Sequence, residues 1–168
     1  MSGKTDSAAG GASIVVVAAP GPQLEAVREL LRKYAQQVDS SKLCFQGFEQ
    51  ELATLPGDYS PPAGCLLLAE LGGMPAACVA LRRLDAARCE MKRLYVRAVF
   101  RGAGLAGLLV ERIIAEARAR GYAEMYLDTL PGMQAARLIY DMLGFKSCPP
   151  YLPEPTPGAD CLVLELKQ

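Results

Sequence analysis

Three glycines, Gly102, Gly104 and Gly107, form a G-x-G-x-x-G pattern. Their spacing is typical of turns that bind an anionic group of a ligand. Glycines in such a turn let backbone N–H groups approach an anion closely. A helix that begins at the turn adds a partial positive charge at its N-terminus. The turn at 101–106 is therefore predicted to hold a diphosphate, and the pattern alone leaves open which molecule carries it.

A dinucleotide-binding fold is one possible owner of this turn. Asp128 ends the next expected strand at about the distance where a ribose-binding acid is expected. However, residues 97–101 separate the preceding strand from Gly102, whereas the first strand of that fold runs directly into its first glycine. The upstream sequence also favours hairpins over helical crossovers. An NAD-dependent oxidoreductase is therefore a remote alternative, and a P-loop is excluded because no Gly-Lys-Ser/Thr follows.

The residue types that the sequence lacks narrow the chemistry further. It contains no histidine, and its six cysteines are scattered without a C-x-x-C spacing. A zinc or copper site has few candidate ligands, so we expect no metal. Ser-His-Asp and Cys-His nucleophiles are excluded because they need histidine. Each cysteine is interpreted as a small buried hydrophobe in a reducing compartment.

The elements that must position the turn follow from hydrophobic periodicity. The two-residue Gly72-Gly73 turn is typical of a hairpin. Hairpins first and a β-α-β pattern later predict an α/β fold, with one mixed antiparallel and parallel sheet of about seven strands and helices on both faces. Helices are expected at 23–38, 45–55, 104–120 and 133–143, and strands at 14–19, 65–71, 76–84, 90–96, 123–128, from 145 onward and at 161–166.

Length and composition predict one domain over 14–168, preceded by a flexible tail over 1–13 that is rich in Ser, Gly and Ala. The 18 basic and 18 acidic residues balance, which argues against a nucleic-acid partner. No apolar run approaches the roughly 20 residues of a membrane span, so we expect no membrane association and a cytoplasmic protein. The sequence leaves open a homodimer formed through the later strands.

Two segments resemble the GNAT acetyltransferase superfamily. The strand Glu90–Val96 and the following Arg101-Gly102-Ala103-Gly104-Leu105-Ala106 resemble its Gln/Arg-x-x-Gly-x-Gly/Ala signature. Downstream, Ala136–Tyr140 followed by Leu143-Gly144-Phe145 resembles its A-x-x-L/I-Y…G-F element. The order of elements also fits, so the resemblance covers nearly the whole chain. This chain departs from many members in having Met133 where they have Asn.

The resemblance implies acetyl-CoA as co-substrate and assigns the predicted diphosphate site to coenzyme A. It implies that the backbone at 94–96 pairs with the pantetheine arm and that the amides at 101–106 hold the diphosphate. The Arg101 side chain is either a phosphate partner or a donor that fixes the loop. The cofactor-binding residues expected on this basis are Leu94, Tyr95, Val96, Arg101, Gly102, Ala103, Gly104, Leu105 and Ala106.

The resemblance also implies two catalytic residues. Tyr140 is expected as the general acid that returns a proton to the leaving thiolate. Glu90 stands eleven positions before Arg101, as a glutamate does in the histone-modifying branch, and is a candidate general base for the amine. The alternative for Glu90 is a surface charge paired with a neighbour such as Lys92. Asp128 and Tyr95 are weaker candidates for the base.

The expected function is N-acetyl transfer from acetyl-CoA to a primary amine of a small molecule or peptide, by direct attack in a ternary complex. The alternative is an acyl-CoA-binding regulatory module without turnover. Tyr34, Phe48 and Tyr151 are candidate acceptor contacts. If two of the four basic residues on the central hairpin faced the acceptor cleft, the substrate would carry a carboxylate or phosphate. A solvated strand face is the alternative for that cluster, which comprises Arg82, Arg83, Lys92 and Arg93.

Overall fold

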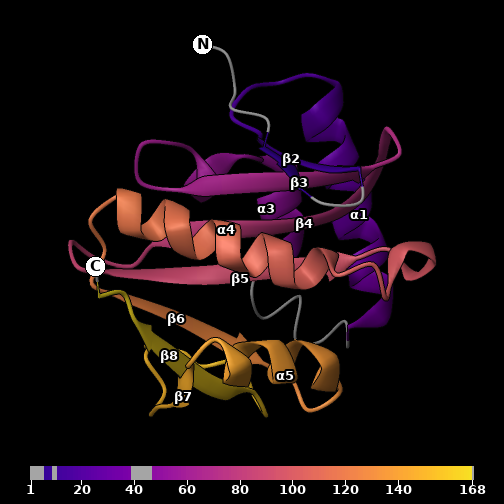
Figure 1. Cartoon of the computed structure of the whole chain (residues 1–168). Coiled ribbons are helices and arrows are strands. Elements are labelled where there is room, and N and C mark those ends of the chain that lie inside the picture. Colours follow the sequence, from indigo (N-terminus) through magenta and orange to yellow (C-terminus); the bar gives the residue numbers. More distant parts are fainter. Residues whose placement is uncertain (1–5, 9–10, 39–46, 168) are drawn as a thin grey trace.

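The protein is described by a computed structural model, which covers residues 6–8, 11–38 and 47–167 (Figure 1). One sheet of eight strands runs in the order β1-β2-β3-β4-β5-β6-β8-β7. The strands are β1 (Asp6–Ala8), β2 (Ala12–Val16), β3 (Cys65–Leu71), β4 (Met74–Arg83), β5 (Arg88–Val96), β6 (Glu124–Thr129), β7 (Lys146–Ser147) and β8 (Asp160–Glu165). The helices are α1 (Pro22–Gln37), α3 (Phe48–Ala53), α4 (Leu105–Ala119) and α5 (Gln134–Met142), with 3₁₀ turns at Gly57–Tyr59 and Ala98–Phe100.

The predicted α/β fold with a mixed sheet is confirmed. The strand expected at 65–71 has those bounds, and the other described elements differ from expectation by a few residues at their ends. The short strand β1 lies within the segment expected to be a flexible tail, and it pairs with β2. Residues 1–5 and 9–10 of that segment, and the start of the helix expected from Phe45, lie outside the described residues.

The strand directions decide between the two folds considered for the glycine turn. Within the described residues, neighbouring strands are antiparallel except for β5 and β6, which are parallel and are joined through α4. A dinucleotide-binding fold requires a mostly parallel, doubly wound sheet. That alternative, and with it the NAD-dependent oxidoreductase, is therefore wrong.

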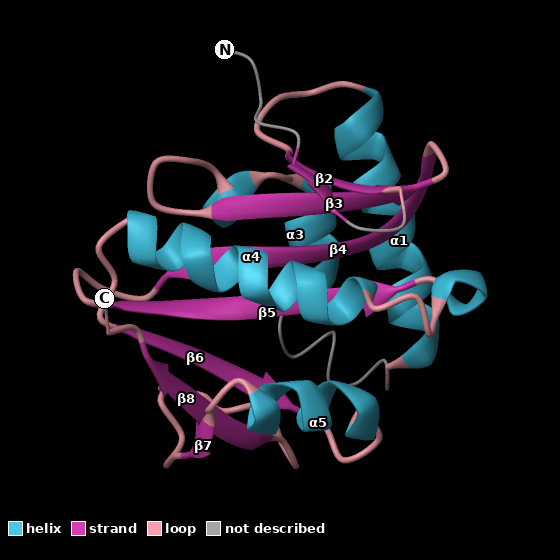
Figure 2. Ribbon diagram, in the orientation of Figure 1, coloured by secondary structure: helices cyan, strands magenta, loops and turns pink. Residues whose placement is uncertain are grey.

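Helices cover both faces of the sheet, as predicted (Figures 1 and 2). On one face, α4 and Tyr140 of α5 pack with inward side chains of the strands, such as Leu67 and Met125, in one apolar cluster. On the other face, α1 and α3 pack against alternate strand residues, such as Leu66 and Leu68, in a second cluster. This division follows the two-residue period of the strands. Within the described residues, none of the helices has the length and apolar character needed to cross a membrane.

An irregularity in β5 opens the sheet. Cys78 pairs with Tyr95 and Ala80 pairs with Lys92, so β5 has one more residue than β4 between these pairs. This extra residue forms a β-bulge at Arg93, which has a φ of 62°. Bulges bend a strand and increase its local twist. The parallel pairing of β5 with β6 covers only Arg88–Glu90, beyond which the two strands diverge (Figure 2).

Candidate active site

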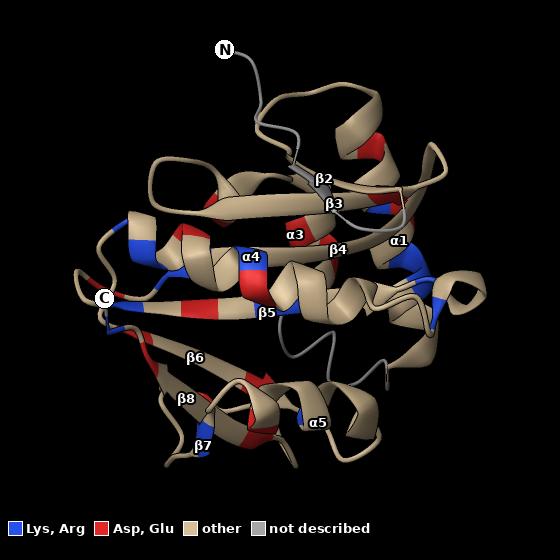
Figure 3. Cartoon of the chain, viewed as in Figure 1, with Lys and Arg blue, Asp and Glu red and all other residues tan. Residues whose placement is uncertain are grey.

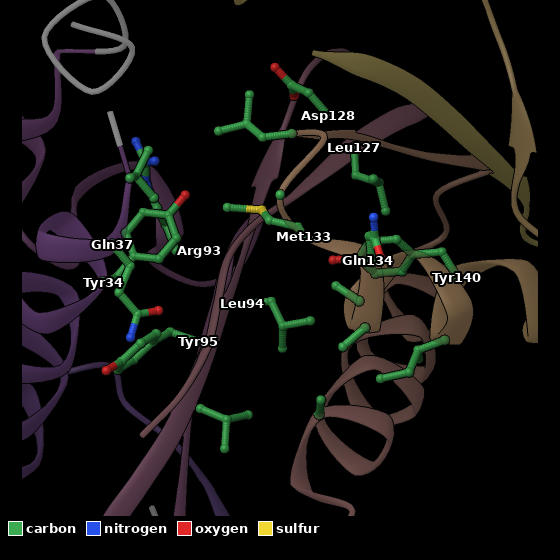
Figure 4. Close-up of a pocket in the computed structure, with 18 of the residues that line it drawn as sticks. Tyr34, Gln37, Arg93, Leu94, Tyr95, Leu127, Asp128, Met133, Gln134 and Tyr140 are labelled. Carbon is green, nitrogen blue, oxygen red and sulfur yellow. The ribbon is translucent and has the colours of Figure 1, made fainter. Parts of the chain in front are cut away.

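A cleft of about 660 Å³ lies where β5 and β6 diverge (Figure 4). Its walls come from β5, the end of β6 and the first turns of α5, with α1 on the far side of β5. Leu94 points toward Tyr140 and α5, whereas Tyr95 points to the opposite side, toward α1. Among the expected cofactor residues, Leu94, Tyr95, Val96, Arg101 and Ala106 line the cleft.

The β5 backbone inside this cleft has an unpaired edge. Pairing with β6 stops at Glu90, so on that side the stretch 91–96 has no strand partner in the described part of the chain. An exposed strand edge offers a row of N–H and C=O groups to an extended ligand. The backbone at 94–96 therefore fits the expected pairing with a pantetheine-like arm that carries amide groups.

The glycine turn lies beside the cleft, before α4: Arg101 and Ala106 at its two ends line the cleft, whereas Gly102, Ala103, Gly104 and Leu105 do not. Gly102 and Gly104 have φ values of 89° and 79°, which L side chains rarely adopt. The amides of Gly102, Gly104 and Leu105 donate no backbone hydrogen bond to any described residue. A Cβ built on either glycine meets nothing within 4 Å, so the space beside these amides is open. Free amides at a helix N-terminus beside open space match the predicted diphosphate site.

The side chain of Arg101 makes contacts within the protein. Its Nε donates a hydrogen bond to the carbonyl of Val96 at 3.2 Å, and its Nη2 donates to Gln37 of α1 at 3.0 Å. These contacts tie the turn to β5 and to α1, which is the loop-fixing role considered for this residue. Arg101 remains exposed and lines the cleft. The groups of the turn that remain for the predicted anion are therefore its backbone amides.

Tyr140 reaches the cleft from α5 and is only 6% exposed. It is the one residue of α5 that is buried in the core, and its ring packs against Phe145 at a centroid distance of 5.6 Å. Burial raises the pKa of Tyr140 above its usual range. The phenol therefore keeps its proton at neutral pH and can act as a proton donor inside the cleft.

Glu90 does not lie at the surface. It is fully buried, and its Oε1 accepts a hydrogen bond from Nε of Arg82 at 2.6 Å. Lys92, the partner considered from the sequence, lies further away at 3.9 Å. Glu90 is also absent from the residues that line the cleft. Direct contact between Glu90 and a substrate amine is therefore not supported by its position.

Tyr151 connects Glu90 to the cleft. Its hydroxyl lies 2.6 Å from Oε2 of Glu90 and 2.7 Å from Oδ1 of Asp128, and Asp128 lines the cleft. The Tyr151 ring packs on Tyr126 at a centroid distance of 4.9 Å. Burial, followed by the negative charges of Glu90 and Asp128, strongly raises the pKa of Tyr151. Tyr151, expected as a substrate contact, thus holds two carboxyl groups together.

The other two expected substrate contacts differ in position. Tyr34 lines the cleft from α1, whereas Phe48 is a core residue, 2% exposed. Both rings pack around the Arg93 guanidinium, at 5.7 Å for Tyr34 and 5.0 Å for Phe48. Arg93 also donates hydrogen bonds to Glu51 at 2.8 and 3.1 Å. Lys92 and Arg93 both line the cleft, but the Arg93 guanidinium is held by Glu51, so of these two cations Lys92 is the one left to face an acceptor.

β5 carries both basic and acidic positions, as Figure 3 shows. In the described residues, no three His, Cys, Asp or Glu side chains gather in a group that could hold a metal ion. Two residues with polar side chains that line the cleft, Gln37 and Gln134, had no role assigned from the sequence. Asp128 was a weaker candidate for the general base. The two-residue period of its strand could have shown that its side chain lies on the face opposite Leu127.

Comparisons with known proteins agree with this geometry. The family model described as the acetyltransferase (GNAT) family matches residues 24–145. An uncharacterized N-acetyltransferase of Schizosaccharomyces pombe is 37% identical over 159 residues, which cover 93% of this chain and 97% of that protein. An N-acetylaspartate synthetase of Danio rerio is 34% identical over 98 residues, which cover 57% of this chain but only 35% of that protein.

Solved structures share the fold. An acetyltransferase from Streptococcus agalactiae superposes with a TM-score of 0.76 at 18% identity, covering 92% of this chain and 98% of that one. A GNAT family acetyltransferase from Elizabethkingia anophelis with acetyl-CoA bound superposes with a TM-score of 0.66 at 22% identity, over the same fractions of the two chains. The chain therefore belongs to the GNAT family of acyl-CoA-dependent acetyltransferases.

Proposed function

We propose that this protein transfers the acetyl group of acetyl-CoA to a primary amine of a small molecule or peptide, by direct attack in a ternary complex. One observation carries the proposal. A single cleft joins an unpaired strand edge and the two ends of the glycine turn, Arg101 and Ala106, to a buried phenol, Tyr140, and to a carboxyl group, Asp128. The structural relative with acetyl-CoA bound supports the identity of the acyl donor.

The chain's own groups fit coenzyme A in two places. The free backbone edge at 94–96 suits the amides of the pantetheine arm, because strand-like pairing satisfies groups on both sides. The amides of Gly102, Gly104 and Leu105 at the N-terminus of α4 suit the diphosphate. Both features belong to the backbone. They therefore depend on the bulge at Arg93 and on the conformations of the glycines. They depend little on which side chains are present.

The proton of the amine is accepted by Asp128. A phenol has one proton to donate, yet the Tyr151 hydroxyl lies within hydrogen-bond distance of two carboxyl groups. Only when one carboxyl carries a proton can both contacts be hydrogen bonds. When Asp128 takes a proton from the substrate, Asp128 can donate to the Tyr151 hydroxyl while Tyr151 donates to Glu90, and both contacts become hydrogen bonds. Glu90 acts through Tyr151 and is a positioning residue, whereas Asp128 faces the substrate.

Tyr140 protonates the leaving group. The amine nitrogen attacks the thioester carbonyl, a C–N bond forms, the C–S bond breaks, and the sulfur leaves as a thiolate. The phenol of Tyr140 is buried at the cleft and protonated, so it can give its proton to that sulfur. Protons thus enter at Asp128 and leave at Tyr140, and the two sites need not exchange them during the reaction.

The cysteines do not favour a covalent intermediate. Burial raises the pKa of Cys65 to about 11 and the pKa values of Cys78 and Cys89 to about 12. A buried thiol that keeps its proton is a poor nucleophile. Burial also raises the pKa of Cys148, which lies nearer the surface. Cys44 lies outside the described residues. Direct attack by the amine is therefore the route that the described side chains support.

The test measures free thiol with the purified protein, acetyl-CoA and a panel of amines. Thiol should appear only when both the acetyl donor and a suitable amine are present. Release of one equivalent without amine, together with a stably acetylated cysteine, would refute direct attack. Binding of CoA without turnover of any amine would favour the alternative, a regulatory module that binds acyl-CoA.

A further inference from the structure

A second cavity, of about 240 Å³, lies on the α1 and α3 face of the sheet, beside the cleft. Side chains of α3, of the 3₁₀ turn Gly57–Tyr59, and of β4 and β5 line it, and most of them are polar. Lys92 lines this cavity and the cleft, so it stands at their junction. A molecule bound here would extend toward the position where acetyl transfer is proposed.

Two of the charges around this cavity are already neutralised. Glu51 accepts two hydrogen bonds from Arg93, at 2.8 and 3.1 Å. Arg82 donates to Glu90 at 2.6 Å. Each is a close pair in which at least one side chain is almost fully buried. Neither pair therefore has much attraction left for a ligand. Asp58 also borders the cavity, but it is exposed to solvent.

Lys92 is the cation that remains. Its side chain is 13% exposed, and its closest acidic partner among the described residues is Glu90 at 3.9 Å. The Glu90 carboxylate is already engaged by Arg82 and Tyr151. Burial, followed by the charge of Arg93, lowers the pKa of Lys92, and Glu90 opposes this only in part. An ammonium group in this setting is stabilised by a further anion.

Tyr59 adds a second donor, which lies near the Glu51 carboxylate. It is 2% exposed, it lines the same cavity, and its hydroxyl has no hydrogen-bond partner among the described residues. A buried hydroxyl without a partner is costly to a folded protein unless something else occupies the site. Burial, followed by the charge of Glu51, raises the pKa of Tyr59, so the group is a neutral donor.

We propose that the acceptor amine carries a carboxylate, which binds Lys92 and Tyr59 in this cavity. The inference rests on the proposed function and names the substrate class, a small amino acid. A single cation suits a carboxylate with one charge better than a phosphate with up to two. Lys92 and Asp128 both line the larger cleft and also a small hollow of about 40 Å³, so the proposed carboxylate site and the proposed proton acceptor border the same space.

The test compares acceptors that differ only at the acidic group. The twenty standard amino acids, their amides and the corresponding aminophosphonates are assayed by thiol release, alongside spermidine and tyramine. The amide has the less basic amine, so it would react faster at neutral pH if the carboxylate were not recognised. At least one amino acid should exceed its amide in kcat/KM by about 10- to 100-fold, the range expected for a hydrogen-bonded charge pair.

Variants then assign the preference to the cavity. Lys92→Met keeps the length of the side chain and removes the charge, and it should abolish the difference between acid and amide. Tyr59→Phe removes one donor and should reduce the difference by roughly threefold to tenfold. Lys33→Met, at an exposed position on α1, is the matched control and should keep the wild-type difference. CoA binding should be unchanged in Tyr59→Phe and Lys33→Met, because neither residue lines the cleft, and it is measured separately for Lys92→Met.

A second measurement separates this inference from the proposed function. Thermal stabilisation by each amino acid is recorded with CoA present, in the wild type and in Lys92→Met. If amines without a carboxylate are acetylated as well as amino acids, the inference fails and the function stands. If no amine releases thiol but amino acids stabilise the wild type and not Lys92→Met, the carboxylate site at Lys92 stands, whereas acetyl transfer to the bound amino acid fails. An equal loss for acid and amide in Lys92→Met would also overturn the inference.

Discussion

Replacing Tyr151 by Phe tests the proton acceptor with a change of one atom. The substitution removes the hydroxyl that lies 2.6 Å from Glu90 and 2.7 Å from Asp128. It keeps the ring, which packs on Tyr126 at 4.9 Å. The carboxyl group of Asp128 stays in the cleft but loses its connection to Glu90.

The size of the effect follows from the two contacts. A hydrogen bond to a charged group contributes about 1.5–3 kcal/mol. If one such bond is completed only when Asp128 takes the substrate's proton, its loss slows that step by about 10- to 100-fold. The decrease should appear in kcat, whereas the affinity for CoA should not change, because Tyr151 is not among the residues that line the cleft. Asp128→Asn, which removes the acceptor itself, should lower kcat further, by about 10²- to 10⁴-fold.

The assay measures initial rates of thiol release at saturating acetyl-CoA and amine. Tyr126→Phe is the matched control. Its hydroxyl also donates to a carboxylate, that of Glu124 at 2.5 Å, but this pair lies outside the cleft and the chain of contacts to Asp128. Wild-type kcat in Tyr151→Phe would refute the role of Tyr151 and Glu90. Equal losses in the two variants would show that the ring stack, and not the shared proton, was disturbed.

Three further predictions concern the acid, the turn and the core. Tyr140→Phe should lower kcat by about 10²-fold or more with little change in CoA affinity, and thiol release with titrated CoA checks both. Gly104→Ala and Gly121→Ala, at φ values of 79° and 82°, should each lower the free energy of unfolding in urea by about 1–2 kcal/mol, but only Gly104→Ala should weaken CoA binding in calorimetry. The Cys78 thiol has a folded-state pKa raised to about 12 from an ordinary value near 9, so its contribution to stability is complete below pH 9 and is lost as the pH rises toward 12. Cys78→Ala should therefore make the decline of unfolding free energy above pH 9 shallower by up to about 1.4 kcal/mol per pH unit in urea titrations, and an unchanged slope would contradict the assignment.

The elements and the turn could be predicted because their signals are local. Strand alternation, helical spacing and the glycines at 102 and 104 act within a few residues of one another. The fold class followed from the order of these elements. The proposed cofactor end of the site is built from backbone groups of the same segments, so it could be predicted along with them.

The acceptor end could not be predicted in the same way. The burial of Glu90 and its link to Asp128 depend on Tyr151, 61 residues later in the chain. The open donors of Lys92 and Tyr59 become evident only when their neighbours are seen to be paired elsewhere. Phe48 was expected at the substrate because it is aromatic, but an aromatic ring serves equally well in a core. Such distinctions depend on three-dimensional contacts between distant segments.

The bulge at Arg93 means that one residue of β5 is supernumerary. On either side of it, Met91 and Leu94 face the α4 side, and Lys92 and Tyr95 face the α1 side. Without Arg93, these four residues would alternate as in a regular strand. A chain lacking that residue would keep each side chain on its present face while losing the bend. The opening in this sheet thus results from one extra amino acid in an otherwise regular strand. Deletion of that single codon is the genetic change expected to close the opening.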